Sequence, residues 1–135
     1  MAIQLASEVP YTLRHQQVLD SEFPCWAEKE AGFVIGAVFA SGILATGAVQ
    51  GTRYTYSPAT AEMLAKVARI EAVCERHGVP LAAAALQSPF GHPSVASVIP
   101  GGLASEHVTR NVAAFRYPIP PTLWAELKHE GLLAG

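Results

Sequence analysis

Two glycine-containing loops are the segments of this sequence whose residue types could bind a ligand. Residues 40–47 follow one apolar run, and residues 99–105 follow another and lead into residues 106–111. Small residues let backbone N–H groups approach a phosphate, and a helix that starts after such a loop offers unpaired donors and a positive dipole end. Neither loop has GxGxxG or Walker spacing, so on spacing alone tight structural turns are the favoured explanation.

Other arrangements that could carry chemistry are weaker. The five histidines never pair at the spacing of metal ligands, which favours surface histidines over a zinc site: His15, His77, His92, His107 and His129. No GxSxG elbow surrounds Ser41 or Ser88, and no general acid has an evident partner. The residues therefore predict neither a catalytic group nor a metal site.

The first loop belongs to an uncharged stretch, residues 31–50, that either forms a strand and a loop or crosses a membrane. Gly32, Gly36, Gly42 and Gly47 weaken a helix, whereas residues 33–39 are rich in β-formers. A run that is apolar at every position is typical of a parallel strand with both faces covered. Strand plus loop is the favoured prediction, and the membrane helix is the alternative.

The remaining pattern alternates strand and helix signals. Residues 3–5 are a short apolar run, residues 20–30 a helix, and residues 50–58 a long polar loop. A helix begins with Thr60 as N-cap, places Met63, Val67, Ile70 and Cys74 on one face, and ends before Gly78 as the C′ residue, with His77 in a capping position.

Three further elements complete the pattern. Residues 81–88 form a short alanine-rich helix, and residues 95–99 a second buried strand. Ser105 is the expected N-cap of a helix through Val108, Val112 and Phe115, and Pro121 opens a last helix with Leu123, Trp124 and Leu127 on one face. This order predicts an α/β domain over residues 1–135 with parallel strands alternating with helices.

The composition limits the kinds of partner that are expected for this chain. The chain is 50% hydrophobic and 15% charged, so it carries little polar surface and is expected to bury apolar surface against another subunit or a missing part of the protein. A net charge of −2 and scattered Lys and Arg argue against nucleic acid. Cys25 and Cys74 lack CxxC spacing, and residues 1–8 do not resemble a signal peptide, which favours a reduced, cytoplasmic protein.

Four segments together resemble the C-terminal part of the aldo/keto reductases, in the D-threo-aldose (L-fucose) dehydrogenase-like branch. They are residues 41–47, residues 70–80, residues 97–101 and Asn111 after them. The resemblance extends from about Tyr11 to Leu133. It implies a (β/α)₈ TIM barrel, of which this chain holds the sixth, seventh (residues 33–39) and eighth (residues 95–99) strands. It also implies hydride transfer between a nicotinamide cofactor and a carbonyl or sugar alcohol.

The resemblance assigns cofactor contacts to both loops. The loop through Phe39, Ser41, Gly42 and Leu44 is expected on the pyrophosphate side of the cofactor. The segment from Gly101 to Asn111, with Ser105, His107 and Arg110, is expected to hold the adenosine half, with Asn111 on the adenine edge. NADP-preferring relatives have Lys and Arg at the positions of Gly101 and His107, so NAD is the expected cofactor and NADP the alternative.

The chain departs from the family pattern in two respects. Where the branch reads Gly-Gly-Pro-Phe-Asn-Ser-Gly, this chain has Gly36-Ala-Val-Phe-Ala-Ser-Gly42. A TIM barrel takes about 250 residues, and no residue here matches the Asp, Tyr, Lys and His tetrad. We therefore expect an NAD(P)-dependent oxidoreductase fragment without a catalytic site. A non-catalytic half-barrel that assembles or binds partners is the alternative.

Overall fold

The computed structural model describes residues 2–6, 16, 31–40, 42–48, 53–54 and 57–134. The helix expected over residues 20–30, together with His15, Cys25 and Ser41, lies outside these described residues. None of the described helices is both long and apolar enough to cross a membrane.

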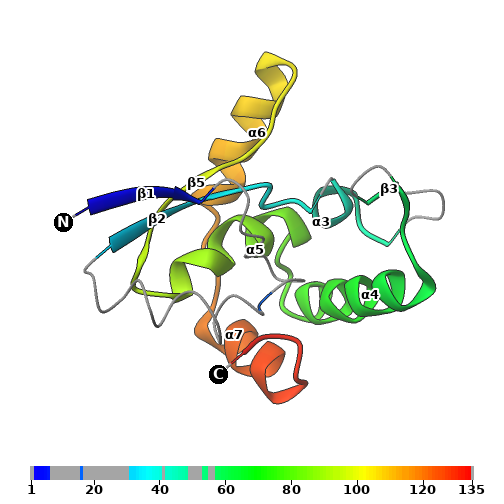
Figure 1. Ribbon diagram of the computed structural model, residues 1–135. Coiled ribbons are helices and arrows are strands. Elements are labelled where there is room, and N and C mark those ends of the chain that lie inside the picture. Colours follow the sequence, from blue (N-terminus) through cyan, green and yellow to red (C-terminus); the bar gives the residue numbers. More distant parts are fainter. Residues whose placement is uncertain are drawn as a thin grey trace.

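The centre of the fold is a parallel sheet in the order β1-β2-β5, formed by β1 (Ala2–Ala6), β2 (Ala31–Gly36) and β5 (Val95–Ile99). Figure 1 shows these strands side by side above α5, with α4 and α7 on the side farther from the sheet. The expected α/β architecture with parallel strands is confirmed. In the segment expected as a long polar loop, β3 (Arg53–Tyr54) and β4 (Ser57–Pro58) form a small antiparallel pair.

β2 ends earlier than its apolar run suggests. Phe33 and Ile35 are buried in the core, but the residue between them, Val34, is only half-buried, so the expectation that both faces are fully covered is wrong for the described sheet. The strand stops at Gly36 because Ala37 has a left-handed backbone conformation with φ of 52°, which turns the chain out of the sheet. The apolar residues that follow form turns.

The long helix α4 (Ala61–Arg76) confirms the best-defined prediction. The Thr60 hydroxyl accepts a hydrogen bond from the Met63 N–H at 3.2 Å, and Val67, Ile70 and Cys74 are buried along one face. The helix ends where Gly78 adopts φ of +64°, a conformation that glycine reaches without steric cost. The residue pattern alone therefore located both ends of this helix.

α5 (Leu81–Gln87) is the central packing element. Its residues Ala83 to Leu86 are buried, and it contacts α3, α4 and α6. The short side chains allow these close approaches, as expected for an alanine-rich helix. The chain continues as the 3₁₀ helix η1 (Ser88–Gly91) before β5.

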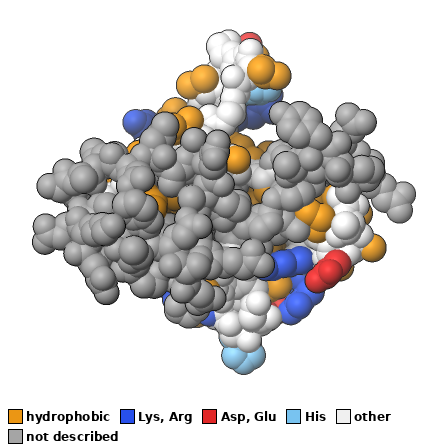
Figure 2. All heavy atoms as spheres, viewed as in Figure 1, with side chains coloured by type: hydrophobic (Ala, Val, Ile, Leu, Met, Phe, Trp, Pro, Cys, Tyr) orange, Lys and Arg blue, Asp and Glu red, His pale blue; other side chains and the backbone are white. Residues whose placement is uncertain are grey.

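β5 corrects the expectation of a buried strand, and α6 (Ser105–Phe115) exposes an apolar face. Ile99 of β5 is 52% exposed, and the apolar face of α6 stays open, with Val108, Val112 and Phe115 exposed by 45–60%. α6 rises away from the body in Figure 1, and hydrophobic side chains are visible on this protrusion in Figure 2. Among the described residues, Phe90 makes an edge-to-face ring contact with Phe115, and the face otherwise stays open. The expected Ser105 N-cap is also wrong, because Ala104 occupies that position without a side-chain hydrogen bond.

The C-terminal helix α7 (Pro121–His129) begins with Pro121, as predicted, and buries Leu123 and Leu127. These two side chains join the main core cluster, which also contains Ile43 and Leu44 of α3 (Ile43–Thr46) and the buried faces of α4 and α5. A second cluster, around Phe33 and Ile35, lies under β2 and β5. Both clusters support the edge of the sheet where the predicted loops emerge.

Candidate ligand-binding site

The two predicted loops start side by side because of the register of β2 and β5. Gly36 and Ile99, the last residues of the two strands, are paired partners in the parallel ladder. Parallel strands present their carboxyl ends at one edge of the sheet, which is where ligands bind in open α/β sheets. The sheet itself therefore brings residues 37–48 and 100–104 to a common place.

The first loop consists of tight turns followed by a short helix. The Ala40 N–H donates to the Ala37 carbonyl at 2.8 Å, and the Gly42 N–H donates to the Phe39 carbonyl at 2.9 Å. Gly42 has φ of +98° and precedes α3. Ile43 and Leu44 anchor α3 in the core, so the loop is held by buried side chains beneath it.

The second loop is held by side chains of α6. The Asn111 side-chain amide donates to the Gly101 carbonyl at 3.3 Å, and the Leu103 N–H donates to Nδ1 of His107 at 3.1 Å. His107 and Asn111 are four residues apart, so they lie on one face of α6. That face looks toward the first loop.

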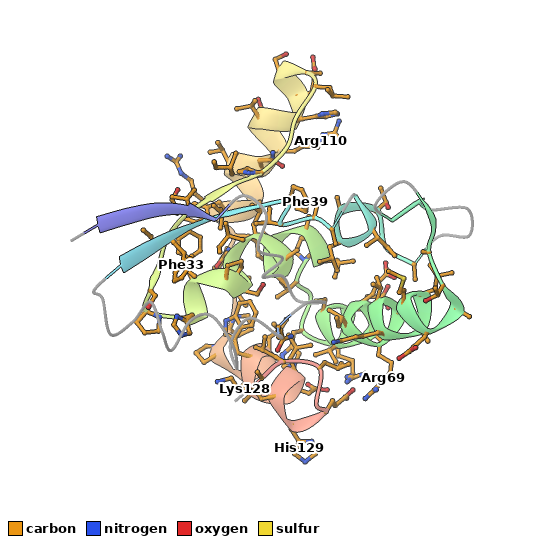
Figure 3. The ribbon with its side chains drawn as sticks, in the orientation of Figure 1. Phe33, Phe39, Arg69, Arg110, Lys128 and His129 are labelled. Atoms are coloured by element: carbon orange, nitrogen blue, oxygen red, sulfur yellow. The ribbon has the colours of Figure 1, made fainter. Side chains whose placement is uncertain are left out.

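Between the loops lies a cavity of about 580 Å³, lined by α3, α5, α6 and the segments that follow β2 and β5. This volume falls within the range of small-molecule sites. Figure 3 shows Phe39 at the end of β2 and Arg110 on α6 on the same side of the molecule, with Arg69, Lys128 and His129 on the opposite side. The lining residues are Ala37, Phe39, Gly42, Ala45, Thr46, Ala82, Gly101, His107, Arg110, Asn111 and Ala114.

Most of the residues expected at a cofactor site meet at this cavity. Its lining includes Phe39, Gly42, Gly101, His107, Arg110 and Asn111.

Leu44 and Ser105, which were also expected at the cofactor site, do not line the cavity. The Leu44 side chain is completely buried and its N–H donates to the Phe39 carbonyl at 3.1 Å, so it supports the loop from beneath and presents no side chain to a ligand. Ser105 is exposed at the start of α6 and is absent from the lining, and Ser41 lies outside the described residues.

Two small residues on the cavity wall, Ala82 of α5 and Ala114 of α6, were missed by sequence reasoning. Ala45 and Thr46 of α3 also line the wall, and they lie in the loop 40–47 that the sequence indicated. The alanine-rich composition of residues 81–88 signalled close packing, and the same small side chains leave room beside α5. Alanine carries no chemical signal of a ligand, which is why composition alone did not find this wall.

The cavity lining combines a guanidinium with open glycine backbone and an amide side chain. Arg110 contributes a guanidinium, and none of the described lining residues carries a carboxylate. A Cβ placed on Gly42 or Gly101 would meet no atom within 4 Å, so their backbone faces open space. The Asn111 amide can both donate to and accept from a planar base. These groups can form hydrogen bonds with an anion or with a planar polar ligand.

A separate charged cluster connects α4 and α7 outside this cavity. Nε2 of His77 lies 2.5 Å from Oε2 of Glu126, and Nε of Arg76 donates to Oε1 of the same carboxylate at 2.8 Å. The hydrogen bond from His77, followed by that from Arg76, lowers the pKa of Glu126. His77 thus has a structural partner beyond its position at the helix end. Among the described residues, no three His, Cys, Asp or Glu side chains gather as a metal site.

Cys74 is equally unsuited to chemistry. Burial, followed by the nearby carboxylate of Glu71, raises the pKa of its thiol to about 11. The thiol therefore stays protonated at neutral pH and serves as a small core side chain. This agrees with the interpretation of Cys74 as a reduced, packed cysteine.

These features define an α/β protein with a ligand cavity at the carboxyl ends of parallel strands. The family model described as "Aldo/keto reductase family" matches residues 6–129. The chain belongs to the aldo/keto reductase family, as the four sequence segments indicated. Members of this oxidoreductase family generally use NAD(P)H, and their (β/α)₈ barrel is consistent with the strands seen here as part of a barrel.

Two relatives place the chain within this family. It is 39% identical to pyridoxal 4-dehydrogenase from Microbacterium luteolum over 119 residues, which are 87% of this chain and 35% of the relative. It is 38% identical to D-threo-aldose 1-dehydrogenase from Pseudomonas sp over 124 residues, 91% of this chain and 38% of the relative. The chain thus spans little more than a third of the length of the curated relatives it matches.

Proposed function

We propose that this chain is the cofactor-binding C-terminal part of an NAD(P)-dependent oxidoreductase of the aldose dehydrogenase type. The observation that carries the proposal is the cavity between the ends of β2 and β5, which gathers Phe39, Gly42, His107, Arg110 and Asn111. The family relationship supplies the class of cofactor, and the cationic lining suits its phosphates.

Each half of the cavity has a separate role in this proposal. The turn through Phe39 and Gly42 faces the pyrophosphate, and the segment from Gly101 to Asn111 faces the adenosine half. Asn111 contacts the adenine edge with the amide atoms that the Gly101 carbonyl leaves available. Leu44 makes no direct contact with the cofactor in this proposal, because its side chain is buried and its N–H donates to the Phe39 carbonyl.

NAD is the proposed cofactor in preference to NADP. Gly101 has no side chain to offer a 2′-phosphate, and Nδ1 of His107 is used by the Leu103 N–H. Among the described lining residues, Arg110 contributes the guanidinium group. We assign this group to the phosphates that NAD and NADP have in common. A clear preference for NADP in a direct comparison of dissociation constants would reverse this assignment.

Titration of the chain with NAD tests cofactor binding. We expect weak binding detected by calorimetry or by NMR shifts at Phe39 and at residues 101–111. Arg110→Ala should weaken binding by roughly tenfold, because a charge-assisted hydrogen bond is lost. Arg69→Ala, on the opposite side of the molecule (Figure 3), is the matched control. A folded sample with no heat and no shifts at millimolar NAD would remove the proposal.

The same proposal predicts no turnover by this chain alone. No residue here corresponds to the family's catalytic tetrad, and a positioned acid or base typically contributes 10²- to 10⁴-fold to rate. Fucose and related aldoses should therefore remain unoxidised with NAD present. NADH formation above a buffer blank would contradict this part of the proposal while leaving cofactor binding in place.

The alternative is a non-catalytic half-barrel that acts as an assembly module. The observation that favours it is an apolar groove of about 530 Å³ beside α6, lined by Phe90, Val98, Val108, Val112 and Phe115 among others. In a solution of this chain alone, a second copy of the chain is the molecule that can pack against this groove. We therefore expect sedimentation coefficients to rise with concentration, and Val112→Lys to reduce the rise. Thr109→Lys, outside the groove, should not.

A further inference from the structure

We propose that His107 and Asn111 are positioning residues that clamp the loop Gly101–Leu103 into its ligand-binding shape before a ligand arrives. The inference rests on the proposed function, because it concerns the same cavity. It adds a specific mechanical role for two side chains of α6, in which Nδ1 of His107 must be a hydrogen-bond acceptor.

The clamp holds the loop at both of its ends. The Asn111 side chain binds the carbonyl of Gly101, and the His107 ring binds the N–H of Leu103, two residues further along. Both side chains come from the same face of α6, so the helix serves as a rigid base. The two hydrogen bonds therefore attach the loop to the helix that forms one wall of the cavity.

Gly102 completes the fit between loop and helix. A Cβ atom at this position would lie 3.2 Å from Cβ of His107, closer than such atoms normally approach. Glycine therefore allows the loop to lie against the first turn of α6, at the distance that the His107 hydrogen bond requires. This close approach is independent of the two hydrogen bonds and supports the same arrangement.

The loop needs such a clamp because little of it is buried. Gly101 and Gly102 are exposed, and the Leu103 side chain is 99% exposed. Glycine loses more conformational freedom on ordering than any other residue. Side-chain hydrogen bonds that order the loop in the free protein remove part of this entropic cost from the binding step.

The contact with Leu103 defines which ring nitrogen of His107 accepts a hydrogen bond. Nδ1 accepts from an N–H, so the ring proton of the neutral imidazole is on Nε2, and a doubly protonated ring could not make this bond. Arg110 lines the same cavity as His107, and Glu106 precedes His107 in the first turn of α6. The described lining residues from α3, α5 and the end of β2 carry no titratable group.

Two substitutions separate acceptor chemistry from side-chain bulk. His107→Asn keeps an acceptor oxygen near the position of Nδ1 and takes up no proton, whereas His107→Leu removes the acceptor. The readouts are hydrogen exchange of the Leu103 amide, corrected for its intrinsic rate, and the affinities for NAD and for adenosine. Adenosine has no phosphate, so its affinity is insensitive to direct attraction between a charged ring and an anion. His129→Leu, on α7, is the control for loss of a surface histidine.

At pH 8 we expect Leu103 to be protected in the unmodified chain and in His107→Asn, and unprotected in His107→Leu. His107→Leu should bind NAD and adenosine about three- to tenfold more weakly, which is the usual effect of one hydrogen bond.

The outcomes distinguish this inference from the proposed function. Unchanged Leu103 exchange and unchanged NAD affinity in His107→Leu would overturn the clamp while leaving cofactor binding intact. Absence of NAD binding in the unmodified chain would instead overturn the proposed function, and Leu103 exchange would still report whether the clamp exists. Loss of protection without loss of affinity would show that the clamp has no part in binding.

Discussion

Ala37 and Ala40 form a tight turn in which the Ala40 N–H donates to the Ala37 carbonyl at 2.8 Å, and both residues have a left-handed backbone, with φ of 52° and 47°. This conformation brings Cβ close to the following carbonyl and costs an L-residue about 1–2 kcal/mol. The branch pattern has Gly and Asn at these two positions, both of which tolerate positive φ. The turn that begins the ligand cavity is therefore strained in this chain.

Relief of this strain is the first prediction. Ala37→Gly should raise the free energy of unfolding by about 0.5–1 kcal/mol, because the strain removed exceeds the added freedom of glycine in the unfolded chain. Ala68→Gly, at an exposed position inside α4, is the matched control and should lower it by about 1 kcal/mol. Urea denaturation measures the free energy of unfolding of both variants. A destabilised Ala37→Gly would show that the turn is not strained.

Substitution of Gly47 is expected to change the free energy of unfolding in the opposite direction. It follows α3 with φ of 85° and ψ of −175°, a region reached almost solely by glycine, and a Cβ there would lie within 3.0 Å of the Glu71 carboxylate. Gly47→Ala should lower the free energy of unfolding by about 2–3 kcal/mol through backbone strain. Gly91→Ala, where a Cβ would meet no atom within 4 Å, should have little effect. Equal effects of the two substitutions would contradict the strain argument.

The third prediction concerns acid stability and Glu126. Its pKa in the folded chain is below the ordinary value because His77 and Arg76 bind the carboxylate. The stabilisation that this shift reflects is complete above the unfolded pKa of about 4.5 and is lost as the pH falls through the lower folded pKa. Glu126→Gln should therefore be less stable than the unmodified chain above pH 4.5, with the difference shrinking as the pH falls below that value.

Urea midpoints measured at half-unit pH intervals check this prediction. The control is Glu62→Gln, at an exposed carboxylate in the first turn of α4. If the difference between Glu126→Gln and the unmodified chain stayed constant from pH 7 to pH 3, the ionised carboxylate would have no part in joining α4 and α7.

The fourth prediction concerns the reactivity of Cys74. A thiol pKa of about 11, against an ordinary 9.0, reduces the thiolate fraction at pH 8 by about a hundredfold. In a Cys25→Ser background, where Cys74 is the one remaining cysteine of the sequence, iodoacetamide should therefore react at least roughly a hundredfold more slowly than in urea. Rapid alkylation of the native chain would contradict the burial of this side chain.

Much of the fold follows from local pattern. The Thr60 cap, the apolar spacing from Val67 to Cys74 and the glycine at position 78 each act within one or two helical turns, so they specified α4 without reference to the rest of the chain. The parallel sheet followed in the same way from the alternation of strand and helix signals. The two glycine loops were identified as candidate sites because they contain small residues, follow predicted strands and lead into predicted helix starts.

Burial was predicted less well, because it depends on what lies opposite a residue. Val108, Val112 and Phe115 have the spacing of a core-facing stripe, yet the described chain leaves them exposed. The amphipathic pattern indicates which face of a helix is apolar. It does not indicate which other element packs against that face. The same reason explains why Ile99, in an apolar strand, is half exposed at the edge of the sheet.

By itself, the sequence determined the kinds of elements, the family, and the residue types available to a cofactor, since these depend on neighbours along the chain. The tertiary structure decided which of those residues meet. The pairing of Gly36 with Ile99 placed Phe39 and Arg110 around one cavity, and the packing of α3 buried Leu44 beneath it. Register and packing join residues far apart in the sequence, and no local pattern encodes those distances.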